Sequence, residues 1–307
     1  MLWILGAAAL IMLASFICFV LVFYARRKPL PEFHLPDGPA YEPYHEIMID
    51  GMKRLRAQSF ETFTIQSHDG LTLSGRYFEY APGAPMEIMF HGYRGSADRD
   101  FCVGVDRAFA LGHSALIVDQ RTTGGSGGRV ITFGIREYRD CLKWVDFAVE
   151  HFGSDAKIIL TGISMGASTV LLAAGENLPS NVVGVLADCG YTSGKAIIHA
   201  VSRHIGLPAW IMYPLIRMGG LLFAGFDLEE NSPIEAVKRI RVPVIFAHGE
   251  ADTLVPCSMS RENYEACTAP KLLYTAPEAG HGLCYLVAGE DYIRALREFW
   301  TAQGIYK

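Results

Sequence analysis

The chain opens with its longest apolar run. Residues 2–25 read LWILGAAALIMLASFICFVLVFYA and contain no Asp, Glu, Lys, Arg or His. A helix of about 20 apolar residues is long enough to cross the hydrocarbon core of a bilayer. Trp3 and Tyr24 stand near its two ends, where aromatic rings prefer the membrane–water interface. Since a run of this length without a polar stripe is too long for a buried core helix, the pattern predicts a transmembrane anchor.

A cleaved signal peptide is the competing interpretation of this run. No basic residue precedes the run, and the run is longer than the apolar region of a typical signal peptide. Arg26, Arg27 and Lys28 follow it directly, and the positive-inside rule then places the rest of the chain on the cytoplasmic side. We therefore expect an uncleaved single-pass anchor over residues 1–28 in the cell membrane, with a cytoplasmic body.

The next segment changes character twice. Residues 29–45 carry five Pro and are typical of a linker, and a short helical pattern follows near 46–58. Two alternating runs, 62–66 and 71–80, are then separated by the turn residues Ser67-His68-Asp69-Gly70. Such a turn between alternating runs predicts an antiparallel hairpin.

After Pro85, short apolar runs alternate with helical patterns. We expect strands at 86–90, 114–118, 157–160, 182–187, 244–247 and 272–274. We expect helices near 98–111, 134–151, 167–174, 257–267 and 289–301. Repeated alternation with nearly continuous apolar strands predicts an α/β fold, with a mostly parallel sheet covered by helices on both faces. This α/β pattern predicts a single body over residues 59–307, preceded by the linker and short helix at 29–58.

Residues 191–231 interrupt the alternation. They hold three short apolar stretches, together with Pro208, Pro214 and several Gly. An ordinary crossover helix is one interpretation, but the insertion is long for a single crossover. The length favours a helical lid or cap at about 191–231, inserted between two strands of the sheet.

Composition narrows the class of protein. The 307 residues are 50% hydrophobic and 19% charged, as in globular proteins, with a formal net charge of −5. The body without the basic flank is more acidic still, which argues against nucleic acid as a partner. The seven Cys show no CxxC pair and no metal-ligand spacing, and they are typical of free thiols, although an even number outside the anchor leaves disulfides open. No metal, nucleotide-phosphate or dinucleotide motif is present, so we expect no cofactor and no metal.

One motif carries candidate chemistry. Gly162-Ile163-Ser164-Met165-Gly166 follows an apolar strand and precedes an apolar helical pattern. A tight strand–turn–helix with small residues on both sides of Ser exposes the hydroxyl at a helix N-terminus, as in a nucleophile elbow. Residues 124–128 match the same pattern formally. They lack the strand immediately before and the helix immediately after, so we interpret them as a flexible loop and Ser164 as the nucleophile.

A serine hydroxyl needs a base and an acid that orients the base. In chain order these follow the nucleophile. Asp252 comes directly after the predicted strand at 244–247, and His281 after the predicted strand at 272–274, so both lie where open α/β sheets build their sites. Glu250 and Asp188 are the alternative acids. His248 is interpreted as a residue that orders its loop.

Acyl transfer also requires hydrogen-bond donors for the oxyanion of the tetrahedral intermediate. The backbone N–H of Met165, directly after Ser164, is one candidate. The second donor is expected from the loop after an earlier strand, His91-Gly92-Tyr93-Arg94-Gly95, and we assign it to the N–H of Tyr93. The alternative is that Gly92 and Gly95 serve only to turn the chain.

Taken together, these stretches resemble the α/β-hydrolase superfamily over residues 60–301. The matching stretches are Phe90-His91-Gly92, Asp119-Gln120-Arg121, GISMG, Ala187-Asp188-Cys189-Gly190-Tyr191, VPVIFAHGEADTLVP and AGHG. The chain is most similar to bacterial membrane-anchored members related to serine aminopeptidase-type and cinnamoyl-esterase-like hydrolases. The resemblance implies an eight-stranded sheet, a cap after the sixth strand, and Ser164, Asp252 and His281 as the catalytic triad. Thr122-Thr123 depart from the pattern, where such proteins often have Gly-His, so the substrate cannot be inferred from it.

Three functions follow as hypotheses. The first is a membrane-anchored serine hydrolase that cleaves a carboxylic ester, such as an acyl lipid or another hydrophobic acyl ester, through an acyl-enzyme on Ser164. The second is a serine peptidase, amidase or thioesterase of the same fold, since the fold does not choose among them. The third is a non-catalytic binding protein tethered to the membrane, which the intact set of Ser164, Asp252 and His281 disfavours.

Overall fold

The computed structural model describes residues 2–27 and 31–306. Lys28 of the predicted basic flank and the first two residues of the predicted linker lie outside the described residues, as do the two terminal residues of the chain. Within the described chain, one eight-stranded sheet in the order β1-β2-β4-β3-β5-β6-β7-β8 forms the centre of the body. The predicted α/β class is confirmed.

The strands agree closely with the apolar runs. They are β1 (Glu61–Gln66), β2 (Thr72–Phe78), β3 (Met86–Phe90), β4 (Ser114–Asp119), β5 (Ile158–Ile163), β6 (Val182–Asp188), β7 (Val244–Gly249) and β8 (Lys271–Ala276). β1 and β2 form the predicted antiparallel hairpin, β2 is antiparallel to β4, and the remaining neighbours are parallel. The parallel strands are almost wholly apolar because helices cover both of their faces.

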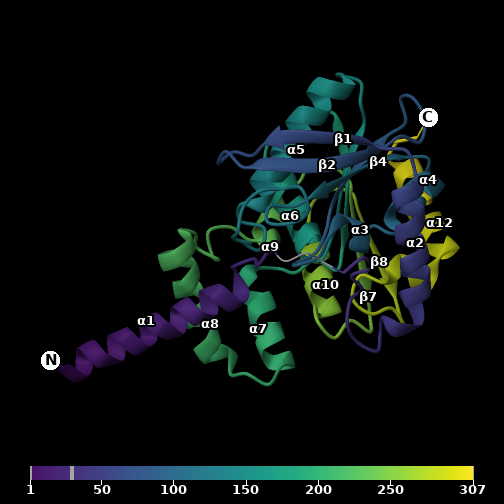
Figure 1. The fold of residues 1–307 in the computed structure, drawn as a ribbon. Coiled ribbons are helices and arrows are strands. Elements are labelled where there is room, and N and C mark those ends of the chain that lie inside the picture. The colour runs from purple at the N-terminus through teal and green to yellow at the C-terminus, as the bar shows by residue number, and fades with distance from the viewer. Residues whose placement is uncertain (1, 28–30, 307) are drawn as a thin grey trace.

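Helices cover the sheet on both sides (Figure 1). On one face lie α5 (Glu137–Phe152), α6 (Met165–Ala174), α9 (Pro233–Ala236), η3 (Val237–Arg239) and α10 (Cys257–Ala266). On the other face lie α3 (Ala97–Asp100), α4 (Gly104–Leu111), α11 (Cys284–Ala288) and α12 (Glu290–Ala302), with η1 (Glu42–Tyr44) and α2 (His45–Ala57) packed outside them. The single helix expected near 98–111 is thus two helices, separated at Phe101–Val103, because the Phe101 side chain turns into the core beneath β3 and β4.

The N-terminal helix α1 (Leu2–Val22) projects from the body at its first residue and joins it at its last (Figure 1). By length and composition it is able to cross a membrane, as is a signal sequence at the same position. Its C-terminal turns are part of the body. Phe23 is 0% exposed and packs edge-on against the rings of Phe133 and Phe226, and the backbone at Tyr24 bridges Val130.

The predicted cap segment forms α7 (Gly194–His204), α8 (Ala209–Gly219) and the π-helical turn η2 (Gly220–Ala224). It follows the sixth strand, as expected. α8 crosses α1, and the α1 end, the cap and the segment around residues 131–135 share one apolar cluster that includes Met165. The division into an anchor at 1–28, a linker at 29–58 and a body at 59–307 stays a prediction, although α1 and α2 both pack against the body.

Candidate active site

Ser164 lies in a strained turn between β5 and α6. Its backbone has φ 57° and ψ −116°, a conformation that costs a non-glycine residue energy. The turn is possible because both flanking glycines lie against backbone. A Cβ on Gly166 would stand 1.8 Å from the carbonyl oxygen of Phe90, and one on Gly162 would stand 2.2 Å from the carbonyl carbon of Gly166. The geometry is that of the nucleophile elbow expected from the pentapeptide.

Asp252 and His281 meet although 28 residues separate them in the chain. The ring nitrogen Nδ1 of His281 donates to Asp252 Oδ2 at 2.6 Å. The other carboxylate oxygen, Oδ1, accepts from the backbone N–H groups of Leu254 and Val255 at 2.8 and 2.9 Å. These bonds fix the carboxylate and assign the Nδ1 proton, so Nε2 of His281 is the nitrogen that is able to accept another proton.

His248 contacts the same carboxylate. Its Nε2 lies 3.2 Å from Asp252 Oδ2 and 2.9 Å from the carbonyl oxygen of Val255, while Nδ1 lies 2.6 Å from the Ser260 hydroxyl. Burial raises the pKa of Asp252, but hydrogen bonds from His248 and His281 outweigh burial and hold this pKa well below its usual range. Asp252 is therefore ionised near neutral pH, and His248 orders the acid loop as the sequence suggested.

Ser164 and His281 line one cavity of about 340 Å³. Within the described chain, the Ser164 hydroxyl makes no hydrogen bond to the His281 ring, and His281 Nε2 lies 4.0 Å from Cys189 Sγ. Catalytic hydrogen bonds are often long in proteins without substrate and shorten in the complex. The cavity also has apolar walls, among them Ile163, Leu254 and Leu286.

The alternative acids lie elsewhere. Glu250 is exposed and pairs with Arg261 at 2.8 Å, away from His281. Asp188 lines the cavity at the end of β6, but its partner is the thiol of Cys284 and burial raises its pKa. The contacts therefore single out Asp252 as the carboxylate that touches His281.

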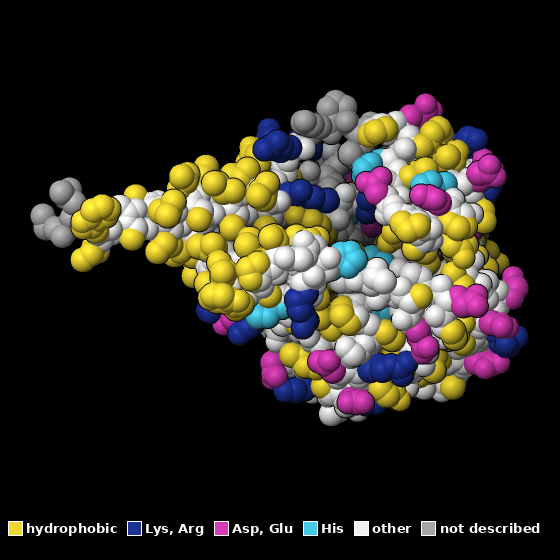
Figure 2. All heavy atoms as spheres, turned by 90° about the horizontal axis from the view of Figure 1, so that it is seen from below, with side chains coloured by type: hydrophobic (Ala, Val, Ile, Leu, Met, Phe, Trp, Pro, Cys, Tyr) yellow, Lys and Arg dark blue, Asp and Glu magenta, His cyan; other side chains and the backbone are white. Residues whose placement is uncertain are grey.

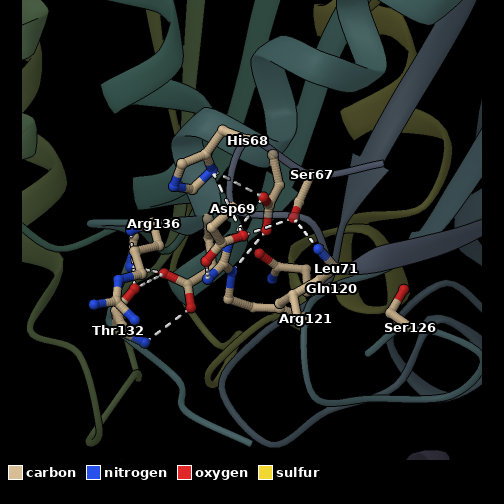
Figure 3. A network of polar contacts seen from close by, with 12 residues as sticks. Ser67, His68, Asp69, Leu71, Gln120, Arg121, Ser126, Thr132 and Arg136 are labelled. Atoms are coloured by element: carbon tan, nitrogen blue, oxygen red, sulfur yellow. Dashed lines mark hydrogen bonds and ion pairs between the residues drawn. The ribbon is translucent and has the colours of Figure 1, made fainter. Parts of the chain in front are cut away.

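The second G-x-S-x-G match has a structural role. Ser126 is fully buried, donates to the Asp119 carbonyl oxygen at 2.5 Å and accepts from the Ser74 N–H at 2.8 Å. Close by, Arg121 binds both oxygens of Asp140 at 2.7 Å and also pairs with Asp69 of the hairpin turn (Figure 3). Burial raises the pKa of Asp69, but hydrogen bonds from Ser67 and Arg121 lower it to about 2. The ion pairs therefore tie the hairpin to the loop after β4.

The same network is a possible cation site, since one atom each of His68, Asp69 and Asp140 lie within 4.8 Å of one another. Both carboxylates already bind the Arg121 guanidinium, which occupies oxygens that a metal ion would need. The residues around Ser164 also include a His–Cys–Asp group, Cys189, Asp252 and His281. Its His281 Nδ1 and Asp252 Oδ2 are hydrogen-bonded to each other, so these two atoms are not vacant as ligands.

The two predicted oxyanion donors are free to act. Within the described chain, the backbone N–H groups of Tyr93 and Met165 donate to no other residue. The Tyr93 loop is held by the end of α1. The Tyr93 hydroxyl donates to the Val22 carbonyl oxygen at 2.7 Å, and the Arg94 guanidinium donates to the carbonyl oxygens of Leu21 and Tyr24 at 2.7 and 3.3 Å. The last carbonyls of a helix have no partner within the helix, so these bonds satisfy them.

Sequence reasoning missed two residues of the site. Tyr41, in the segment interpreted as a linker, lines the cavity and donates its hydroxyl to the His281 carbonyl oxygen at 3.0 Å. Cys189 follows β6 with φ 49° and lies beside the His281 ring. Cys189 belongs to the Ala187–Tyr191 stretch that resembles the superfamily, and this resemblance could have indicated it. Nothing in the pattern around Tyr41 indicated a contact with the site. Conversely, no described residue of 191–231 lines this cavity.

Two protein families match parts of the chain. The family described as alpha/beta hydrolase fold matches residues 88–213, and the family described as Serine hydrolase (FSH1) matches residues 164–282, from Ser164 to just beyond His281. Together with the sheet order and the elbow, these matches show that the chain has the α/β-hydrolase fold. The segment that carries Ser164 and His281 is similar to the serine hydrolase family.

Similar proteins include a curated relative and two solved structures. The uncharacterized protein YqkD of Bacillus subtilis is 30% identical over 190 residues, which are 62% of this chain and 62% of YqkD. Among solved structures, the Pyrococcus furiosus esterase Pf2001 has a TM-score of 0.66 at 21% identity, covering 81% of this chain and 94% of the esterase. The Pyrococcus horikoshii acylaminoacyl peptidase has a TM-score of 0.56 at 18% identity, covering 81% of this chain and 43% of the peptidase. At these identities the structures share the fold.

Proposed function

We propose that this protein is a membrane-anchored serine hydrolase that cleaves carboxylic esters with a hydrophobic acyl group. The observation that carries the proposal is the strained Ser164 elbow in one cavity with His281, whose ring is held by the ionised Asp252. Ser164 Oγ attacks the acyl carbon, and His281 Nε2 takes its proton. Asp252 orients the ring and stabilises the imidazolium that forms.

The backbone N–H groups of Met165 and Tyr93 hold the oxyanion of the tetrahedral intermediate. The protonated His281 then gives its proton to the leaving alcohol, which leaves an acyl-enzyme on Ser164. Water, deprotonated by His281, releases the acid and restores the serine. These steps require only groups that this chain supplies, and they account for the separate positions of base, acid and donors.

The test of the nucleophile is covalent labelling of the full-length chain by a fluorophosphonate probe. Ser164→Ala is expected to lose the label, whereas Ser126→Ala, the serine of the second G-x-S-x-G match, is expected to keep it if the variant folds. Ser258→Ala, which changes an exposed serine of α10, is a second control. Labelling of Ser164→Ala at the level of the unchanged chain would falsify the assignment, and an unlabelled parent chain would favour a non-catalytic binding protein.

The preference for esters rests on the apolar cavity wall and on the esterase among the structural neighbours. The peptidase among the same neighbours keeps amide hydrolysis as the second candidate. A panel of p-nitrophenyl esters of graded chain length, matched thioesters and aminoacyl amides separates them. Turnover of amides alone would reject the ester proposal.

Membrane anchoring is supported by the length of α1 and by the way its end is built into the body. Removal of the apolar run 2–25 as a signal peptide would also remove the buried ring of Phe23. It would leave the Tyr93 hydroxyl and the Arg94 guanidinium without their carbonyl acceptors. Arg26 and Arg27 directly after the helix favour a cytoplasmic body. Protease accessibility in sealed inside-out vesicles tests the orientation: the body is expected to be digested there and protected in intact cells.

A further inference from the structure

The exposed large hydrophobic side chains of the described chain gather on two adjoining elements. Apart from Ile47, Phe60, Tyr80 and Leu254, all of them lie on α1 or between residues 205 and 223. Figure 2 shows this continuity: hydrophobic side chains run from the projecting helix onto the neighbouring part of the body. An apolar surface of this extent is unusual on a protein surrounded by water.

The cap part of this surface is as apolar as a membrane segment, but it is too short to span a bilayer. Residues 205–224 contain one charged residue, Arg217. Its guanidinium is neutralised by Asp227 at 2.7 Å and by Glu229 at 2.8 Å. The continuous helical stretch Ala209–Ala224 spans 16 residues, about 24 Å at 1.5 Å per residue, which is too short to cross a bilayer core of about 30 Å.

The two elements are fixed to each other. A Cβ on Gly219 of α8 would stand 2.6 Å from the Ser15 carbonyl oxygen, so only a glycine allows this approach. The Phe223 ring packs against the rings of Phe16 and Phe19, with centroid distances of 5.1 and 5.8 Å. The cap therefore accompanies α1 wherever these turns of α1 lie.

The position of this contact along α1 determines its depth. Residues 3–14 precede the contact and span about 18 Å, so they cannot cross a bilayer core of about 30 Å alone. The contact begins at Ser15, about 10 Å along the axis before Val22. If α1 spans the core, its last turns and the cap packed on them lie within the same leaflet.

We propose that the cap is a second membrane element: α8 and η2 lie in the leaflet nearest the body, with the side chains of Trp210, Leu221 and Leu222 among the lipid acyl chains. The occupant of this surface is the lipid bilayer itself. Trp210 is 76% exposed and Leu222 53% exposed in the protein alone, and insertion removes both from water. Interfacial helices bury their apolar face by about 5–10 Å. This depth matches the distance of about 10 Å along α1 between Ser15, where the contact with the cap begins, and Val22. This proposal rests on the anchoring proposed above.

Tryptophan quenching in the full-length chain tests it. The protein is reconstituted in phosphatidylcholine vesicles whose acyl chains are brominated near the headgroup. Trp144 and Trp300 are buried in the core and give a constant background. Trp3→Phe then reports on Trp210, and Trp210→Phe reports on Trp3. The matched control, Trp3→Phe/Trp210→Phe/Tyr80→Trp, places an exposed ring beside Phe109 of α4, on the side away from the cap (Figure 1).

We expect brominated lipid to reduce the Trp210 emission by about half, because the ring would lie at the depth of an interfacial helix. The Tyr80→Trp control is expected to remain unquenched and to be quenched by aqueous iodide. Quenching of Trp3 without quenching of Trp210 would overturn the insertion of the cap and leave the anchor intact. If brominated lipid quenches neither Trp3 nor Trp210, the anchor would be overturned as well. A Trp210 shielded from iodide but not quenched by lipid would mean that protein covers the surface, which also contradicts the proposal.

Discussion

Asp252 is held by more contacts than any other residue of the candidate triad. Both of its oxygens are hydrogen-bonded, and His248 stands behind the carboxylate. The residue is thus a rigid acceptor for Nδ1–H of His281. The consequence is that the ring presents Nε2, rather than Nδ1, towards the cavity.

We expect Asp252→Asn to lower kcat/KM on a short soluble ester by about 10³–10⁴-fold, because an amide favours the wrong His281 tautomer and does not stabilise the imidazolium. Steady-state kinetics measure the effect. Glu250→Gln is the matched control on the same loop, since Glu250 faces Arg261, and it is expected to leave kcat/KM unchanged. Equal losses in the two variants would remove Asp252 from its proposed role.

At the scale of elements, the loop after β3 is held from outside the sheet by α1. We expect Tyr93→Phe to lower kcat/KM about fivefold, because it removes one hydrogen bond of about 1 kcal/mol that fixes the loop to the Val22 carbonyl. The ring still stacks on Phe133, so the fold is kept. Tyr80→Phe is the control. An unchanged kcat/KM with an unchanged melting temperature would show that α1 does not position the loop.

The cap surface makes a second prediction at this scale. Leu221→Glu/Leu222→Glu is expected to lower the ratio of ester hydrolysis on vesicles to hydrolysis of a soluble ester by about tenfold, because burying two carboxylates among acyl chains is unfavourable. Ile47→Glu on α2, of similar exposure, is the control. A ratio equal to that of the control would argue that vesicle-borne substrate does not approach through this surface.

Elements were predictable from the sequence where burial follows a local pattern. The parallel strands appear as apolar runs because both faces are covered, and the Ser164 elbow appears because its glycines are required by backbone contact. Contacts between distant segments leave no such pattern. Nothing near Phe23 indicates that its ring fills a socket made by Phe133 and Phe226, and Tyr41 lies in a proline-rich stretch that gives no periodic signal. The chain order of Ser164, Asp252 and His281 was predictable from the motifs, and their catalytic roles stay a prediction.

For the whole molecule, a buried ion cluster joins the central sheet to helix α4 and to the C-terminus. Glu87 of β3 accepts from Arg107, from His113 at 2.8 Å and from the Thr161 hydroxyl at 2.7 Å. The other His113 nitrogen bonds the Tyr306 hydroxyl at 2.8 Å. Burial raises the pKa of Glu87, but Arg107 and His113 outweigh burial and lower the pKa to about 2.

This cluster predicts acid sensitivity. The folded pKa of Glu87 lies below its unfolded value of about 4.3, so its stabilising contribution is complete above that pH and is lost as the pH falls towards 2. The contribution is about 3 kcal/mol. We expect the free energy of unfolding, measured by denaturant in detergent, to fall by this much more in the unchanged chain than in Glu87→Gln. Parallel pH profiles of the two proteins would contradict the prediction.

The seating of Phe23, with the backbone bridge at Tyr24, bears on how such a chain can be altered. A helix taken from an unrelated single-pass protein would supply hydrophobic length but not the Phe23 ring or the backbone bridge of Tyr24. It would also lack the carbonyl groups in the positions that Tyr93 and Arg94 bind. Exchanging α1 would therefore amount to a change near the candidate active site. Any chimera of this protein should keep everything from Ser15 onward and vary only the turns before it.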